Sequence, residues 1–267
     1  MGTAPMTRVL RYAGANHSLL AHNQANSFAA GYALSFYAGE AVYSFIPKNA
    51  CSTMRYSLAL ANGAIETPAQ VNWIHNNNTT FRATLAELAR AKYSFVILRN
   101  PFLRLASCFF DKFVDQTPVA YAFHRLRNYE SSPHALTFRD FVTQLKPHLR
   151  GNEHWRPQID FLVYKSYDAV FALEDFPFAV NTLREKIGLE VHDARALTKH
   201  GADQLEPLAD ENCVADVSAF DLLALKRAGK APALARFYDG ALAKLAGALY
   251  AEDVALYRDW TGRGPVF

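Results

Sequence analysis

The feature that most constrains the fold is a buried strand followed at once by a capped helix. Residues 93–98, YSFVIL, are β-forming and bounded by polar positions, a pattern typical of a strand buried on both faces. Asn100 then matches the N-cap preference of a helix, and Pro101 matches the preference of its first position. One apolar stripe follows at helical spacing: Phe102, Leu105, Ala106, Phe109, Phe110 and Phe113. The sequence therefore predicts a strand, a tight turn and an amphipathic helix here.

Two further strands are predicted, one before and one after this unit. Residues 41–46, AVYSFI, precede a helix that we expect from Ser52 to about Ala61. Residues 167–176, YDAVFALEDF, form the third strand, and the chain is mostly helical from Pro177 onward. Because strands and helices alternate, we expect an α/β fold. It would be a P-loop-like parallel sheet flanked by helices, with a largely helical C-terminal part.

Composition predicts one folded domain and excludes several classes of protein. The chain has 267 residues, of which 51% are hydrophobic and 20% charged, as in globular proteins. A net charge of +3 is too weak to indicate a nucleic-acid partner, although a local basic pocket for an anion fits. The three cysteines lie far apart, which favours neither a disulfide framework nor a metal cluster. We find no run of about 18 apolar residues, so we expect a soluble, cytoplasmic protein without a transmembrane segment.

The first candidate anion site follows the first predicted strand, in residues 43–54, YSFIPKNACSTM. Backbone amides at a helix N-terminus attract phosphate, and Ser52 and Thr53 add hydroxyls in the first turn. Lys48 contributes a mobile positive charge. The nucleotide-triphosphatase motif would place a lysine after a glycine-rich loop, whereas here the lysine precedes the turn and no glycine is present. A P-loop kinase is therefore the weaker alternative.

The second candidate anion site follows the central strand. Arg99 ends that strand, where a guanidinium is destabilising unless it is paired with an anion. Ser107 lies on the next predicted helix, off its apolar stripe. We expect Arg99 and Ser107 to contact one phosphate from two sides. Arg104, between them, either has a role in the site or simply faces solvent or pairs with Asp111.

Both sites resemble those of a known family. FIPKNACSTM resembles the 5′-phosphosulfate-binding loop of sulfotransferases. VILRNPFLRLASCFFDKF resembles their 3′-phosphate motif, in the form found in membrane-type carbohydrate sulfotransferases and their bacterial relatives. NEHWRPQ, YDAVFALEDF and LYAEDVALY resemble segments of the chondroitin and HNK-1 branch. The resemblance covers about residues 41–258, which we take as the motif-bearing core of a single domain over 1–267.

The resemblance implies a donor, 3′-phosphoadenosine 5′-phosphosulfate (PAPS), and the residues that hold it. Its 3′-phosphate would contact Arg99 and Ser107. Asn100 stands where the family usually has aspartate, and asparagine caps a helix equally well. The relatives bind one phosphosulfate at the loop rather than wrapping a triphosphate, which would explain the missing glycines. The 5′-phosphosulfate would lie on the loop formed by Lys48, Asn49, Ala50, Cys51, Ser52 and Thr53.

The implied activity is in-line transfer of a sulfuryl group to a hydroxyl of a carbohydrate or glycoconjugate, and it needs a base. His75 is the first candidate, because heparan-type sulfotransferases carry a catalytic histidine in a comparable stretch. His154, in EHWRPQ, is the second, as base or acceptor contact, and Glu174 could orient a histidine or bind substrate. Lys48 would neutralise charge on the bridging oxygen, and no metal is required. A catalytically inactive module that binds the bisphosphate nucleotide remains an alternative.

Overall fold

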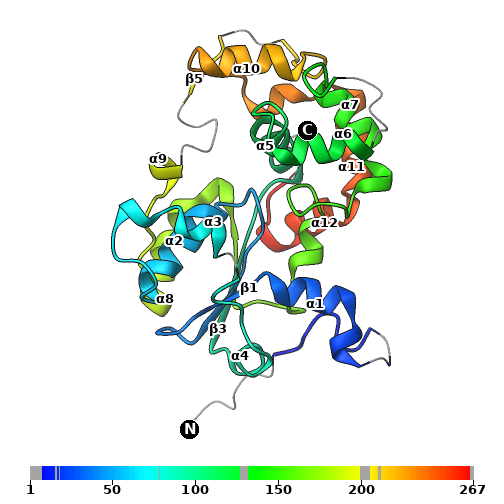
Figure 1. Cartoon of the computed structure of the whole chain (residues 1–267). Helices are drawn as coiled ribbons and strands as arrows, with labels where there is room; N and C mark the ends of the chain where they lie inside the picture. Colours follow the sequence, from blue (N-terminus) through cyan, green and yellow to red (C-terminus); the bar gives the residue numbers. More distant parts are fainter. Residues whose placement is uncertain are drawn as a thin grey trace. The chain divides into compact units, whose positions relative to one another are not determined.

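The computed structural model describes residues 8–15, 17, 19–77, 79–126, 132–198, 205–209 and 212–264 (Figure 1). The chain divides into two compact units, each combining segments that lie far apart in the sequence. Unit 1 comprises Met1–Arg99, Pro157–Lys199 and Asp259–Gly262. Unit 2 comprises Asn100–Arg156, His200–Arg258 and Arg263–Phe267. The division does not test whether the two units form one domain, so the single domain over 1–267 stays a prediction.

Unit 1 is built on a four-stranded sheet with the order β1–β2–β3–β4. The strands β2, β3 and β4 are parallel, and β1 pairs antiparallel with β2 at the edge. All three predicted strands are present, and the α/β fold is confirmed. The sequence did not predict β1, because four residues carry too little periodicity to be recognised. The strands are β1 Ala33–Phe36, β2 Ala41–Ser44, β3 Tyr93–Leu98 and β4 Ala169–Ala172.

Helices cover both faces of this sheet (Figure 1). Alternate strand residues point to opposite faces, so Tyr43 and Phe95 pack on one face, with ring centroids 4.9 Å apart, and Val42 packs on the other. The first face is covered by α2 (Cys51–Ala61), α3 (Trp73–Asn76) and α8 (Phe176–Ile187). The second face is covered by α1 (Gln24–Gly31) and α4 (Leu85–Arg90).

The N-terminal segment, for which the sequence predicted no structure, is tied to the start of the sheet. Arg8 forms a partly buried ion pair with Asp168 at 2.6 Å and donates to the Ala91 carbonyl at 2.9 Å. Asp168 also accepts from the Ser94 amide at 2.6 Å. These contacts join three chain segments at the end of the sheet where β3 and β4 begin.

Unit 2 is mainly helical, and its core is rich in phenylalanine. Every residue of the predicted apolar stripe is buried in this core. The predicted cap is confirmed: Asn100 Oδ1 accepts hydrogen bonds from the amides of Phe102 (3.0 Å) and Leu103 (3.4 Å). The short parallel pair of β5 (Glu206–Pro207) and β6 (Lys230–Ala231) departs from the predicted helical pattern. The helices are α5 Pro101–Lys112, α6 Pro118–Leu126, α7 Phe138–Gln144, α10 Ala219–Arg227, α11 Gly240–Leu249 and most of α12 Ala251–Thr261.

Arg104 on α5 is a buried structural residue. It is only 2% exposed, so the solvent-facing alternative is wrong. Its guanidinium donates to the carbonyl of Arg156 at 2.7 Å and to that of Glu153 at 3.1 Å. Backbone carbonyls inside a protein must be paired, and Arg104 therefore fixes the course of residues 153–156.

We predict that Arg104→Leu lowers the free energy of unfolding by about 2–3 kcal/mol, because two partly buried carbonyls lose the charged donor that holds them. Urea denaturation of both proteins measures the difference. Arg125, an exposed residue on α6 of the same unit, provides the control, and Arg125→Leu should change stability by less than about 0.5 kcal/mol. Equal stability of Arg104→Leu and wild type would contradict the structural role.

Candidate functional site

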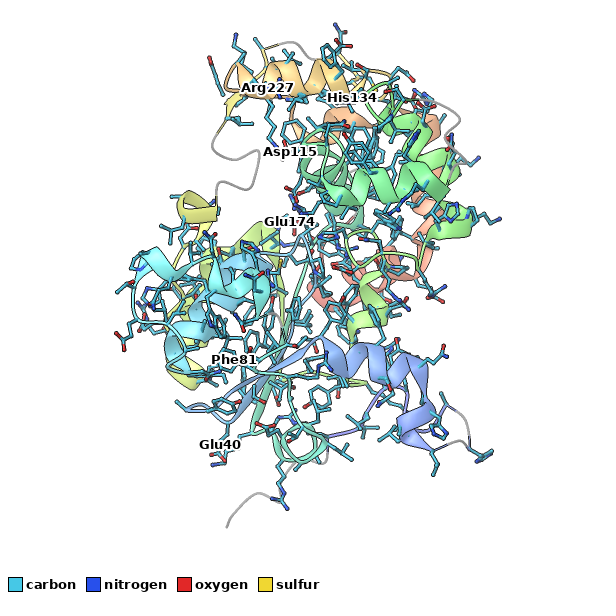
Figure 2. All side chains as sticks on the ribbon, in the orientation of Figure 1. Glu40, Phe81, Asp115, His134, Glu174 and Arg227 are labelled. Carbon is cyan, nitrogen blue, oxygen red and sulfur yellow. The ribbon has the colours of Figure 1, made fainter. Side chains whose placement is uncertain are left out.

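The candidate site lies where the parallel strands of unit 1 end. Because β2 and β3 run in the same direction, the loop after β2 and Arg99 after β3 meet at one edge, where ligands bind in open α/β sheets. Figure 2 shows Glu40, which precedes β2, and Glu174, which follows β4, at opposite ends of this unit. Glu174 is exposed in the short 3₁₀ turn Leu173–Asp175. The sheet thus brings the predicted loop, Arg99 and Glu174 to the same edge.

The loop between β2 and α2 has an unusual backbone conformation. Lys48 and Ala50 have φ angles of 74° and 55°, in the left-handed region that side chains other than glycine rarely adopt. The loop therefore adopts glycine-like backbone angles at two positions although it contains no glycine. Ala50 is the N-cap of α2 and provides no side-chain hydrogen bond. The first-turn amides of α2 consequently receive no hydrogen bond from an N-cap side chain, and such amides are suited to binding an anion.

Arg99 and the loop contact each other directly. The half-buried Arg99 donates from Nη1 to the carbonyl oxygen of Lys48 at 2.9 Å. A guanidinium has five N–H donors, and this bond uses one of them. Ser107 lies half-buried on α5, in unit 2. Its predicted contact with the same phosphate as Arg99 stays a prediction.

Two buried amide side chains join the loop to the end of β3, and sequence reasoning missed one of them. Asn49 donates from Nδ2 to the carbonyl of Ile97 (2.9 Å) and to Oε1 of Gln158 (2.6 Å). Gln158 Oε1 also accepts from the Arg99 amide (3.0 Å), and its Nε2 donates to the Arg99 carbonyl (2.9 Å). Both side chains are 0% exposed. Gln158 is the last residue of the NEHWRPQ segment. Nothing in the sequence around it indicates that it pairs with Arg99.

The predicted hydroxyl ligands have different surroundings. Ser52 is half-buried in the first turn of α2. Thr53 is buried, and its Oγ1 accepts a hydrogen bond from the Ala194 amide at 3.3 Å. The Thr53 hydroxyl can still donate its proton elsewhere. Cys51, between the loop and Ser52, carries a free, half-buried thiol. The donor contacts of these residues stay predictions.

The helix that carries His75 is joined to the same turn. His75 is exposed on α3. Arg55 of α2 donates from Nε to the Cys51 carbonyl at 3.3 Å and from Nη1 to the Ile74 carbonyl at 3.2 Å. Sequence reasoning missed Arg55, although its place one turn into α2 was visible. One guanidinium therefore ties the residue before His75 to the first turn of α2.

His154 belongs to unit 2 and is held by its own loop. Its backbone amide donates to Asn152 Oδ1 at 3.0 Å, and its Nδ1 lies 2.8 Å from the same oxygen. Next along the chain, the Trp155 carbonyl accepts from the Tyr250 hydroxyl at 2.5 Å. Burial raises the pKa of that hydroxyl well above its ordinary value, so Tyr250 stays protonated as a donor. His154 is therefore held by contacts within its own segment, and its catalytic role stays a prediction.

Comparison with known proteins assigns the family. The model of the sulfotransferase family matches residues 39–202, more than half of the chain, so the chain belongs to the sulfotransferase family. It is similar to carbohydrate sulfotransferase 14 of Danio rerio, with 25% identity over 171 residues. That match covers 57% of this chain and 47% of the relative, so the chain spans about half of the relative's length. No solved structure matches significantly. The predicted family is confirmed.

The match also corrects one prediction. The relative is a carbohydrate sulfotransferase, the class whose membrane-type members the motifs resemble, and this conflicts with the predicted cytoplasmic location. We therefore withdraw that location. Among the residues that the structure describes, every helix is too short or too polar to span a bilayer.

The left-handed conformation of Ala50 makes a testable prediction. Ala50→Gly should leave the free energy of unfolding unchanged or raise it by up to about 1 kcal/mol, because relief of strain offsets the added freedom of the unfolded chain. Ala50→Val should lower it by about 1–2 kcal/mol, since a β-branched residue is strained most at this angle. Thermal denaturation of the matched pair measures both. A valine variant as stable as the glycine variant would contradict the left-handed conformation.

Proposed function

We propose that this protein is a sulfotransferase that moves a sulfuryl group from PAPS to a hydroxyl of a carbohydrate or glycoconjugate. The observation that carries the proposal is the uncapped first turn of α2 beside Arg99 and Lys48, in a chain of the sulfotransferase family. Together they offer backbone amides and two cations to one anionic ligand. The name of the carbohydrate sulfotransferase relative supports a saccharide acceptor.

In this proposal, the donor binds along the edge of the sheet. The 5′-phosphosulfate takes the amides of the first turn of α2 and the hydroxyls of Ser52 and Thr53, helped by the helix dipole. Arg99 takes the 3′-phosphate through charge-assisted hydrogen bonds from its guanidinium. The predicted contact of Ser107 with that phosphate rests on the sequence.

The transfer needs a developing charge to be stabilised and a proton to be removed. The acceptor oxygen attacks sulfur, the bond from sulfur to the bridging oxygen breaks, and the bisphosphate nucleotide leaves. Lys48 neutralises the charge that grows on the bridging oxygen, as fixed cations do in phosphoryl transfer. His75 takes the acceptor proton in the leading version, and His154 takes it in the second.

We predict that the two cations affect different steps. Arg99→Ala should weaken binding of adenosine 3′,5′-bisphosphate by about 2–4 kcal/mol, the scale for truncating a buried charged partner. Lys48→Ala should reduce turnover more than bisphosphate affinity, because its target is charge that grows in the transition state. Calorimetry with the bisphosphate and a sulfate-transfer assay over a panel of hydroxylated acceptors measure both.

The same pair of assays separates the alternatives. Binding of the bisphosphate without transfer to any acceptor would indicate an inactive nucleotide-binding module. Activity that requires ATP and magnesium would indicate a kinase. Unchanged bisphosphate affinity in folded Arg99→Ala would remove Arg99 from the donor site.

The second functional prediction concerns the base. If His75 deprotonates the acceptor, His75→Ala should lower turnover by roughly a hundredfold to ten-thousandfold, the usual scale of general-base catalysis. Bisphosphate affinity should be unchanged, because Arg99 and the loop are intact. Wild-type turnover should rise with pH through one ionisation that His75→Ala lacks. If His154→Ala alone removes that ionisation, His154 is the base, and if neither variant does so, Glu174 becomes the better candidate.

A further inference from the structure

A closed ring of hydrogen bonds joins the donor loop to Arg99, and the buried amides of Asn49 and Gln158 form half of it. We propose that Asn49 and Gln158 are positioning residues, which set the Arg99 guanidinium against the first turn of α2. The inference rests on the proposed function, because it assigns these amides a role in donor binding. Neither residue would touch the transferred group.

Gln158 acts on Arg99 as a neighbouring strand would. The sheet ladder ends at Leu98, the last residue of β3. The Gln158 amide then pairs with both the N–H and the C=O of Arg99, at 3.0 and 2.9 Å. A side-chain amide offers the same donor and acceptor as a peptide group. The Arg99 backbone is therefore held although the strand has ended, and its side chain starts from a fixed point.

Asn49 ties the same amide to the loop. Its Nδ2 lies between two oxygens, those of Ile97 and Gln158, so the reversed orientation would place oxygen against oxygen. Among the described residues, Asn49 Oδ1 is buried without a hydrogen-bond partner, which destabilises the fold. The residues on either side, Lys48 and Ala50, have left-handed angles. An unpaired buried oxygen and strained backbone angles both destabilise a fold, and they are found together where the surrounding structure holds a functional conformation in place.

A bond between Arg99 and Lys48 closes the ring. Arg99 Nη1 donates to the Lys48 carbonyl at 2.9 Å, and Lys48 is covalently joined to Asn49. The loop, Asn49, Gln158 and Arg99 thus form one cycle, in which a shift of one member disturbs the contacts of the others. Members of such a network act non-additively. Loss of Gln158 should therefore matter to donor binding only while Arg99 is present.

The test compares Gln158→Met, which keeps the length of the side chain and removes its polar groups, with a matched control. Asn62 is an amide at the opposite end of α2, where it donates to the Ser35 carbonyl (2.9 Å) and accepts from the Tyr37 amide (3.1 Å). Asn62→Ala therefore removes the same kind of contact away from the site. Asn49→Ala provides a second variant of the ring in case Gln158→Met does not fold.

Two measurements are made on each variant: calorimetric affinity for adenosine 3′,5′-bisphosphate and hydrogen exchange of the Arg99 amide. Gln158→Met should weaken bisphosphate binding by about fivefold to tenfold, the scale of one net hydrogen bond, and should speed exchange at Arg99. In an Arg99→Ala background, the same substitution should cause no further loss of affinity. Asn62→Ala should change neither affinity nor exchange at Arg99.

The outcomes are distinct. Equal affinity of Gln158→Met and wild type, or an equal loss in the Arg99→Ala background, overturns the positioning role. Unchanged exchange at Arg99 in both ring variants overturns the ring itself. If wild type does not bind the bisphosphate, the proposed function fails and the donor role of the ring fails with it, while the exchange data still decide whether the amides hold Arg99.

Discussion

The candidate site depends on the parallel pairing of β2 with β3. Parallel strands end at the same edge of a sheet, so the loop that follows β2 and the arginine that follows β3 become neighbours although some fifty residues separate them. That pairing lets Arg99 reach the Lys48 carbonyl. It also leaves backbone polar groups at the end of β3 that need partners, since the ladder does not continue past Leu98. The amides of Asn49 and Gln158 supply those partners.

The helix α2 connects the site with its surroundings at several points. Its first turn carries the uncapped amides, and Ala50 before it has a left-handed conformation. Arg55, one turn later, reaches the helix of His75 through the Ile74 carbonyl. On the buried side, Thr53 accepts from the Ala194 amide. A shift of α2 would therefore move the loop and the His75 helix together, which suits a site that must hold a donor and a base in a fixed relation.

In unit 2 the core consists largely of aromatic side chains. There, buried side-chain donors hold the backbone of an irregular segment. Arg104 and Tyr250 reach carbonyls of the segment that carries His154. Both are buried donors directed at backbone, which is a way to hold an irregular segment that has no ladder of its own. His154 consequently has a defined position within its unit, independent of the catalytic role that the sequence suggests.

The sequence by itself determined the elements whose signals are local. The six-residue strand before Arg99, the Asn100 cap and the apolar stripe of α5 are written in neighbouring residues, and the anion loop is recognisable from its motif. Only the tertiary structure decided which residues meet. The strand β1 exists because it pairs with β2, and Gln158 supports Arg99 from 59 positions further along the chain. The burial of Arg104 also depends on the tertiary structure, because the carbonyls that accept its hydrogen bonds come from a distant segment. Local propensity specifies helices, caps and turns, whereas a hydrogen bond between distant residues forms only after the sheet and core have brought them together.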